Sequence, residues 1–344
     1  MSRGPQERAT LDSIAELVGV SKATVSKVLN ERPGVSEATR RRVREAFRQL
    51  GYMPTTRTPD PLGRRTVVAL FDTLANLYAL RMLDGLIAEA QREGFEVVPD
   101  VTSPLDPGPG ALLRPERVRQ MREHGHQGLL VVTTQLSDEV TRTCAEIGLP
   151  VVAIDPPNAL DPAVASVGSN NWSGGYQATE HLVSLGHRRI GFVGGSAAHA
   201  GLRERRGGYR AALEEAGISE DPELVGESGM GAAGDDAARM LELPDPPTAF
   251  YASSDPGALA VLRQVTEKGL RVPEDISIVG YDDTYTSLPL PILLTTVHTP
   301  IVEIGRVAMA TVVGMTQGRP PVSSHLQLAT SLVVRESSAP PPVR

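Results

Sequence analysis

The sequence predicts an α/β protein in which a small helical unit precedes a larger core of parallel β-sheets. Two observations support this prediction. Apolar residues recur at helical spacing between residues 10 and 50, and short β-branched runs alternate with helical stretches after residue 65. This alternation is typical of parallel sheets covered by helices, and about 280 residues of it exceed one such sheet. We therefore expect the core to consist of two similar lobes.

Length and composition indicate a globular protein. The chain has 344 residues, 40% hydrophobic and 22% charged, enough for two or three compact units. Its one cysteine, Cys144, permits no intrachain disulfide, and we expect it to be a buried small residue rather than a nucleophile. No stretch has the apolar length of a signal peptide or a membrane span, so we expect a cytoplasmic protein.

The formal charge of −7 conceals an uneven distribution along the chain. Residues 1–65 contain 13 Lys and Arg against 7 Asp and Glu, a balance of +6, whereas the other residues contain 21 against 34, a balance of −13. A basic segment on an acidic protein indicates that a polyanion binds at one end.

Three short helices are predicted between Thr10 and Leu50. Ser21 and Ser36 stand at N-cap positions, and Gly19 suits the turn between the first two helices. The apolar positions that define the helices are Leu11, Ile14, Ala15 and Val18, then Val25, Val28 and Leu29, and finally Val43, Phe47 and Leu50.

Such a unit would place its second helix in the major groove of DNA. Ser21 and Thr24 would then contact phosphates, and Lys22 and Lys27 would reach base edges or phosphates. The small side chain of Ala23 would permit close approach to a thymine methyl group. The alternative is an amphipathic three-helix domain whose basic face is only solvated.

Four regions are predicted along the chain. The segment TTRTPDPLGRRT contains two prolines and is predicted to be a linker. SPLDPGPG at 103–110 is predicted to be a surface loop, and the proline-rich end is predicted to be a disordered tail. The predicted regions are a helix-turn-helix headpiece at 1–53, a hinge or linker at 54–65, a two-lobed ligand-binding and dimerisation core at 66–335 and the tail at 336–344.

The stretch from Thr10 to Pro54 is similar to the headpiece of LacI/GalR-family bacterial transcription regulators. The residues that match the family motif are Ala15, Gly19, Val20, Ser21, Thr24, Val25, Ser26, Asn30, Val35, Gly51, Tyr52 and Pro54. The likeness continues through EHLVSLGHRRIGFVGG, RERRGGYRAAL and DISIVGYDD, and it extends to about Arg335.

This resemblance implies a DNA-binding headpiece, a hinge and a core similar to periplasmic sugar-binding proteins, with homodimers bound to palindromic operators. It assigns base reading to Lys22, Ala23 and Lys27. Val20 and Val25 are expected in the headpiece core. Backbone contact or helix packing is expected for the residues around them, Ser21, Thr24, Ser26 and Asn30.

The hinge departs from the family pattern. Family members have a short helix here whose leucine enters the minor groove at the operator centre. Pro59 and Pro61 interrupt that helix, because proline lacks an amide donor and disfavours helical geometry in the residue before it. Leu62 is the candidate wedge, one position later than expected, and an ordinary linker is the alternative.

A sugar cleft requires planar charged groups and an aromatic face, and such residues follow several predicted strands, where open α/β sheets bind ligands. The candidates are Asp72, Tyr78, Trp172, Arg205 and Asp282. The resemblance implies ligand contact for Arg205 and Asp282. Helix capping by the aspartates, ordinary packing of the aromatic rings and a solvated charge at the arginine are the alternatives.

Three further residues, Asp155, Ser254 and Asp255, match cleft positions of the family. Ser254 stands where many sugar-responsive members carry asparagine. A single hydroxyl cannot reproduce the hydrogen-bond pattern of an amide, so a non-sugar effector remains an alternative.

Two rival functions remain at this stage. The glycine cluster in GFVGGSAAHAG is similar to a phosphate-binding loop, but no complete nucleotide-binding motif occurs, and His181, His187, His298 and His325 lack metal-ligand spacing. A transport solute-binding protein would fit the core but not the headpiece. We therefore expect that the protein is not an enzyme and needs no cofactor or metal. We expect it to be an allosteric repressor of carbohydrate uptake or catabolism genes that responds to a small sugar.

The C-terminus bears on the oligomeric state. The family's tetramers use a C-terminal leucine heptad helix, which RESSAPPPVR cannot form, so we expect a dimer.

Overall fold

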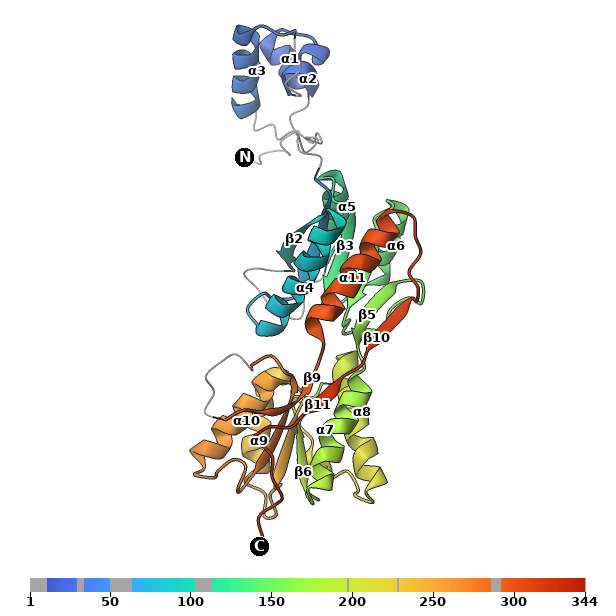
Figure 1. Cartoon of the computed structure of the whole chain (residues 1–344). Coiled ribbons are helices and arrows are strands. Elements are labelled where there is room, and N and C mark those ends of the chain that lie inside the picture. The colour runs from blue at the N-terminus through green and yellow to red at the C-terminus, as the bar shows by residue number, and fades with distance from the viewer. Residues whose placement is uncertain are drawn as a thin grey trace. The chain divides into compact units, whose positions relative to one another are not determined.

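The chain divides into a helical unit, Met1–Gly63, and a core, Arg64–Arg344 (Figure 1). The computed structural model describes residues 11–29, 34–49, 64–102, 113–196, 198–227, 229–285 and 292–343. The predicted contacts of Asn30 and Leu62, the hinge prolines and the loop at 103–110 lie outside these residues.

The helical unit contains α1 (Leu11–Val18), α2 (Lys22–Leu29) and α3 (Glu37–Gln49). Both predicted N-caps are confirmed, because Ser21 Oγ accepts the amide of Thr24 at 3.1 Å and Ser36 Oγ accepts that of Thr39 at 3.3 Å. Gly19 has a φ of +70°, which a turn at this point requires.

The three helices share one small apolar core. Val25 is fully buried and Val20 packs against the cluster, as predicted. The guanidinium of Arg42 in α3 donates to the carbonyl of Val18 at 2.5 Å and so satisfies a terminal group of α1. The buried core residues are Ile14, Ala15, Val18, Val25, Val28, Val43 and Ala46.

The first lobe of the core has a parallel six-stranded sheet in the order β10-β5-β4-β3-β1-β2. Helices α4 and α11 cover one face, and α5 and α6 cover the other, each pair over its own apolar cluster. The strands are β1 (Thr66–Phe71), β2 (Glu96–Val101), β3 (Gly128–Val132), β4 (Val151–Ile154), β5 (Ala165–Ser169) and β10 (His325–Leu328), and the helices are α4 (Leu77–Glu93), α5 (Pro115–Glu123), α6 (Asp138–Glu146) and α11 (Ile301–Thr316).

The second lobe has a five-stranded sheet in the order β11-β9-β8-β7-β6, in which only β11 is antiparallel to its neighbour. Helices α9 and α10 cover one face and α7 and α8 the other. The strands are β6 (Ile190–Val193), β7 (Ala249–Ala252), β8 (Ser277–Asp282), β9 (Thr295–His298) and β11 (Ser331–Val333), and the helices are α7 (Asn171–Ser184), α8 (Ala200–Glu215), α9 (Ala233–Met240) and α10 (Asp255–Glu267). The two expected lobes are thus confirmed.

The chain passes between the lobes at three places: from β5 to α7, from β9 to α11 and from β10 to β11. Two of these crossings are joined, because the amide of Asn170 donates to Leu328 O at 2.9 Å and Thr330 Oγ1 donates to Asn170 O at 3.3 Å. The run LQLATSLVV, predicted as one strand, therefore belongs to two sheets. Strands β5 and β9 were not predicted, because ASVGS and TTVH are short and rich in small or polar residues.

The predicted disorder of the tail at 336–344 is wrong for its described residues. Ser337 is fully buried, accepts the amide of Ile278 through its carbonyl at 2.7 Å and donates its hydroxyl to Ile278 O at 2.6 Å. The Ala339 carbonyl lies 2.9 Å from His187 Nε2. The backbone just before the three prolines thus pairs with the second lobe, although the composition is typical of disorder.

No helix in the described part of the chain is long and apolar enough to cross a membrane.

Candidate functional site

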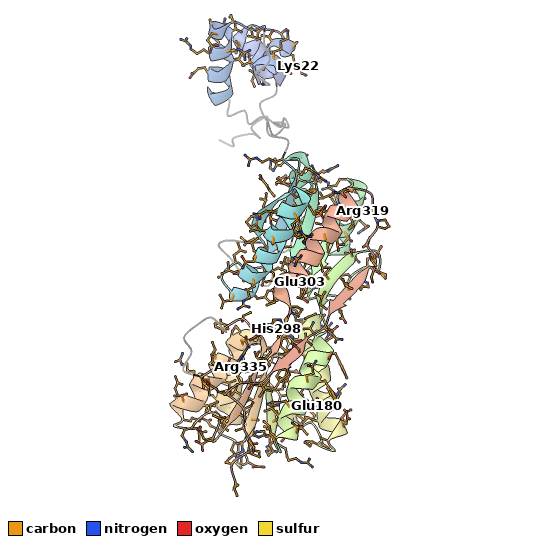
Figure 2. All side chains as sticks on the ribbon, in the orientation of Figure 1. Lys22, Glu180, His298, Glu303, Arg319 and Arg335 are labelled. Carbon is orange, nitrogen blue, oxygen red and sulfur yellow. The ribbon has the colours of Figure 1, made fainter. Side chains whose placement is uncertain are left out.

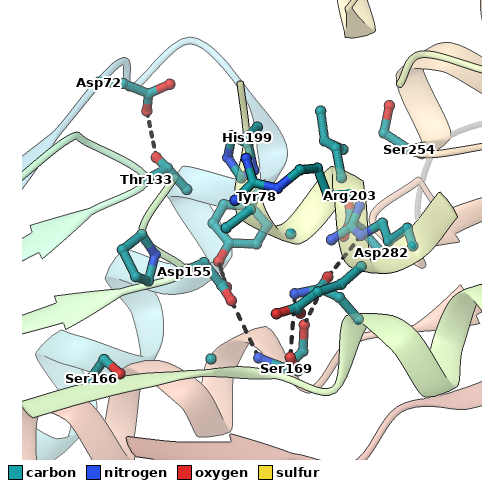
Figure 3. A pocket seen from close by; sticks show the side chains of 18 of the residues that line it. Asp72, Tyr78, Thr133, Asp155, Ser166, Ser169, His199, Arg203, Ser254 and Asp282 are labelled. Atoms are coloured by element: carbon teal, nitrogen blue, oxygen red, sulfur yellow. Dashed lines mark hydrogen bonds and ion pairs between the residues drawn. The ribbon is translucent and has the colours of Figure 1, made fainter. Parts of the chain in front are cut away.

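A cavity of about 930 Å³ lies between the two lobes of the core, at the carboxyl ends of their strands. This is where open α/β sheets bind ligands. Six of the eight predicted effector residues line it, namely Asp72, Tyr78, Asp155, Arg205, Ser254 and Asp282. Figure 3 labels all of these except Arg205.

The side chain of Arg205, on α8, is held from several sides inside the cavity wall. Its Nε donates to Asn171 Oδ1 at 2.8 Å, its Nη1 donates to Ser253 O at 2.5 Å, and its Nη2 lies 3.4 Å from Asp282 Oδ1. The guanidinium carbon also lies 3.6 Å from the centre of the Tyr281 ring. Arg205 is therefore a fixed, buried cation and not a solvated charge.

Electrostatics around this pair favour a charged arginine. Burial opposes the charge, but Asp282 and nearby tyrosines outweigh it, so the pKa of Arg205 lies above its usual value. Burial raises the pKa of the Asp282 carboxyl, and Arg205 opposes that shift. A ligand that replaced water here would meet a planar donor beside a carboxylate acceptor.

The opposite lobe contributes a second polar pair. Tyr78, in the first turn of α4, donates its hydroxyl to Asp155 Oδ2, and the amide of Ser169 donates to Asp155 Oδ1 at 3.2 Å. Burial raises the pKa of Tyr78 well above its ordinary value, and Asp155 adds to the shift, so the phenol stays protonated. Burial also raises the pKa of Asp155.

The remaining two predicted residues in the cavity, Asp72 and Ser254, already form hydrogen bonds within the protein. Asp72 is exposed and accepts the hydroxyl of Thr133 at 2.7 Å. Asn76, and not Asp72, caps α4. Ser254 is nearly fully buried, and its hydroxyl accepts the amide of Gly257 at 3.2 Å as the N-cap of α10.

The backbone is unusual where the strands meet the cavity. Thr133, Asp155 and Asp282 have φ values of 50°, 43° and 98°, in the left-handed region that side chains other than glycine rarely adopt. All three line the cavity. Strained residues of this kind cluster at ligand sites, because the surrounding structure holds them there.

The structure adds three residues that sequence reasoning missed: Asn171, His199 and Glu204. Burial, with Arg205 and Arg203, lowers the pKa of His199 to about 4, and its buried Nδ1 has no hydrogen-bond partner in the described chain. A neutral imidazole thus lines the cavity. Its place in the glycine-rich GGSAAHAG was the only signal in the sequence.

Two predicted residues do not reach the cavity. Trp172 is 48% exposed and stacks on Tyr176 with ring centres 5.6 Å apart. Asn171, one residue earlier in α7, takes the inward position. Asp255 is buried behind the cavity wall, where it accepts the Thr296 hydroxyl at 2.6 Å and the amide of Thr284 at 2.7 Å.

This buried carboxyl predicts a pH dependence of folding. Burial raises the pKa of Asp255 to about 7, with Asp282 and Asp283 reinforcing the shift and the bonds from Thr296 and Thr284 opposing it. An unfolded aspartate has a pKa of about 3.9, so the folded protein retains a proton that the unfolded chain has lost between these values. Stability therefore falls as the pH rises through this window.

We expect Asp255→Asn to remove this part of the pH dependence. The amide can accept from the Thr284 amide and donate to the Thr296 hydroxyl, so the contacts persist without a titrating group. Between pH 5 and pH 7 the free energy of unfolding should fall by about 2 kcal/mol less in the variant than in the wild type. Urea unfolding at several pH values measures this, and equal slopes would refute it.

The DNA-facing expectation rests on α2. Lys22, Ala23 and Lys27 are all exposed on this helix, as base reading requires, and Figure 2 labels Lys22 there. The hydroxyls of Ser21 and Thr24 lie 2.9 Å apart, and Ser21 caps the helix. These two residues thus stabilise the start of α2 in addition to any phosphate contact.

The features that suggested an enzyme have structural explanations. A Cβ at Gly195 would lie 2.7 Å from the Phe192 ring and 3.0 Å from Gly226 O, so close packing requires this glycine. Cys144 is buried, and burial raises its pKa to about 11. Within the described ranges, no three His, Cys, Asp or Glu side chains gather in a way that would hold a metal.

A helix-turn-helix unit joined to a two-lobed core with a polar cleft defines a ligand-responsive, DNA-binding transcription regulator. Residues 10–55 match the family description "Bacterial regulatory proteins, lacI family", and residues 179–338 match a periplasmic binding protein-like domain. The chain belongs to the LacI family, as its relatives also show.

Two curated relatives cover nearly the whole chain. The HTH-type transcriptional repressor PurR of Aliivibrio salmonicida (strain LFI1238) is 33% identical over 88% of this chain and 90% of its own. The HTH-type transcriptional regulator CelR of Thermobifida fusca is 32% identical over 96% of this chain and 99% of its own.

Solved structures agree with this assignment. A transcriptional regulator CelR–cellobiose complex superposes with a TM-score of 0.69 at 31% identity, covering 96% of this chain and 100% of that one. The lac repressor dimer bound to operator and the anti-inducer ONPF gives 0.70 at 27% identity, with 97% and 100% covered. These relatives are regulators and not enzymes.

Proposed function

We propose that this LacI-family repressor controls genes of carbohydrate uptake or catabolism and that a saccharide in the cleft sets its affinity for the operator. The observation that carries the proposal is the buried Arg205–Asp282 pair, which faces the Tyr78–Asp155 pair across one cavity. The first pair belongs to the second lobe, and the second pair belongs to the first lobe.

The chemistry of the lining favours a polyhydroxylated ligand. Carboxylates accept two neighbouring hydroxyls and a guanidinium donates to two, so alternating donors and acceptors match a sugar edge. The lining has two tyrosines, Tyr78 and Tyr285, and no tryptophan or phenylalanine among the described residues. The CelR–cellobiose complex supports the same class.

Effector binding can act on the DNA only through a difference between two arrangements of the protein. Hydrogen bonds between described residues already join the lobes: Arg81 Nη2 donates to Thr284 O at 3.1 Å, and the amide of Ala200 donates to Pro157 O at 2.8 Å. A ligand held by both lobes would add to these contacts and stabilise one arrangement of the lobes.

We also infer that the protein acts in the cytoplasm as a homodimer on a near-palindromic operator, because twofold protein symmetry must match the DNA. The lac repressor neighbour, a dimer bound to operator, supports this inference. Light scattering should show a dimer, and a monomer that binds its operator tightly would contradict it.

The proposal is tested by ligand screening of the full chain. Thermal-shift measurements against glucose, galactose, mannose and xylose and against cellobiose, maltose, lactose, mannobiose and xylobiose should identify a stabilising saccharide, because ligands that bind the folded state raise the melting temperature. That saccharide should change the affinity for an operator selected from random duplexes. If no saccharide raised the melting temperature, the proposed effector class would be wrong.

The headpiece assignment predicts the effect of Lys27→Ala. Loss of a base or phosphate contact should weaken operator binding by about 1–3 kcal/mol, and loss of a phosphate contact should also make the salt slope shallower by about one. Fluorescence anisotropy at several salt concentrations measures both. Lys268→Ala, which removes an exposed lysine paired with Glu242 in the second lobe, is the matched control and should change neither. Equal operator affinity in the two variants would refute the role of Lys27.

A further inference from the structure

We propose that the cavity holds a second sugar ring in an outer subsite formed by Ser166, Gly168, His325 and Gln327, where β5 and β10 run side by side, so that the effector is a disaccharide or a longer saccharide. This inference rests on the proposed saccharide function. All four residues line the cavity, in a part of it to which the Arg205–Asp282 and Tyr78–Asp155 pairs do not belong.

The alternation of β5 shows which of its residues face the cavity. Ser166 and Gly168 are half-buried, whereas Val167 between them is buried and packs in the core cluster under α4 and α11, although it too is among the residues that line the cavity. The carboxylate of Asp155 lies on the same side as Gly168, because a Cβ there would lie 2.5 Å from Asp155 Oδ1. Ser166 and Gly168 therefore continue the surface to which Asp155 belongs.

The register with β10 extends this surface by one strand. His325 is opposite Ser166, and Gln327 is opposite Gly168, so both belong to the same face of the sheet. The hydroxyl of Ser166 lies 2.9 Å from His325 Nδ1, which confirms the shared face. Neighbouring strands are about 4.8 Å apart and alternate residues about 6.6 Å apart, so the floor extends beyond Asp155 by about the width of a sugar ring.

The position of this floor relative to the inner pairs is visible in Figure 3. Asp155 lies between Ser166 on one side and Asp282 on the other in that view. A first ring between the Tyr78–Asp155 and Arg205–Asp282 pairs would therefore have its neighbour over β5 and β10. The cavity volume of about 930 Å³ leaves room for both rings, since it is near the upper end of the range of about 300–1,000 Å³ found for ligand pockets.

The outer floor has the chemistry of a neutral, hydroxyl-rich group. Strands β5 and β10 contain no Asp, Glu, Lys or Arg. The exposed Gln327 amide offers one acceptor and two donors, and it makes no hydrogen bond to any described residue. Leu160 supplies apolar surface at the same cavity. A charged second group would find no counter-ion on this floor.

The place of β10 in the sheet allows a longer chain. It is one of the two edge strands of the sheet in the first lobe, and His325, Leu326 and Gln327 are all exposed. The outer subsite thus opens to solvent on one side, and further rings could project there without a clash. The inner pairs decide which sugar binds first, and the outer floor decides how long the saccharide must be.

The test is calorimetric titration of the full chain with glucose, galactose, mannose and xylose and with cellobiose, maltose, lactose, mannobiose and xylobiose. We expect one disaccharide to bind at least tenfold more tightly than either of its component sugars. In Gln327→Ala the ratio of disaccharide to monosaccharide affinity should fall at least fivefold. Gln120→Ala, an exposed glutamine on α5 outside the cavity, is the matched control and should leave the ratio unchanged.

Two results would overturn the inference while the proposed function stands. They are a monosaccharide that binds as tightly as every disaccharide containing it, and an unchanged ratio in Gln327→Ala. If no saccharide of the panel bound at all, the proposed function would fail instead, and the outer subsite with it. Because Gln327 lies exposed on an edge strand and its side chain forms no hydrogen bond with the described chain, its replacement should not disturb folding.

Discussion

Replacing Arg205 with alanine should lower effector affinity by about 2–4 kcal/mol, roughly 30- to 1,000-fold, because hydroxyls of the ligand and the Asp282 carboxylate would lose a charged donor in a desolvated site. The headpiece contains none of the residues that line the cavity, so operator binding without effector should persist. Anisotropy of a labelled operator, titrated with the stabilising saccharide, should therefore show a protein that binds DNA but no longer responds.

The control for this experiment is the next residue. Arg206 also belongs to α8, but it pairs with Glu220 and Glu227 and does not line the main cavity. Arg206→Ala should leave effector affinity within about twofold of the wild type, because neither Arg206 nor its two partners line that cavity. A normal effector response in Arg205→Ala would remove this residue from the site.

Gly175→Ala should destabilise the second lobe and weaken effector binding together. Helices α7 and α8 approach so closely that a Cβ at Gly175 would overlap the carbonyl oxygen of Arg205, which is backbone and cannot rotate away. Overpacking of this kind costs about 1–3 kcal/mol or more of the free energy of unfolding. The shift would also displace the Arg205 side chain from Asp282.

Replacing a different glycine with alanine should raise the free energy of unfolding instead of lowering it. Gly234, in α9, would meet nothing closer than 3.5 Å, and its φ is not in the left-handed region. Gly234→Ala should therefore stabilise the protein by about 0.4–1 kcal/mol, because it restricts the unfolded chain. Urea unfolding of the two variants separates close helix packing from a general effect of alanine. If both variants were equally stable, the α7–α8 contact would not be as tight as described.

The inner cavity was largely predictable from the sequence. Buried strands end at Phe71, Ile154 and Asp282, and parallel strands bring their carboxyl ends to one edge, so polar residues that follow them converge. The resemblance to the family then distinguished Arg205 from its charged neighbours. The hydrogen bonds that hold Arg205 could not be predicted, because Asn171 and Ser253 contact it from distant parts of the chain.

The misplaced residues show where sequence reasoning stops. Helical residues point about 100° apart, so an assignment that is wrong by one position exchanges a cavity residue for a surface one, as Trp172 and Asn171 did. Asp255 immediately follows Ser254, the N-cap of α10, yet it turns inward to Thr284 and Thr296. The ordered tail depends on backbone bonds to Ile278, which composition does not report.

The same limit applies to the outer floor. Ser166 and His325 are 159 residues apart, and β5 was not recognised as a strand, so nothing in the sequence brought them together. The two residues pair because the chain returns from the second lobe to the first, where β10 pairs with β5. In short polar strands of this kind, the sheet register and not the residue pattern decides which side chains line a site.

If a ligand in the cleft controls operator affinity, operator must change the affinity for that ligand by the same factor. The affinity of the full chain for a selected operator should be measured with and without saturating saccharide, and the affinity for the saccharide should be measured with and without saturating operator. We predict that both ratios differ from one, by roughly 5- to 150-fold, and are equal to each other. An operator affinity that stays the same at saturating saccharide would show that the cleft does not control DNA binding.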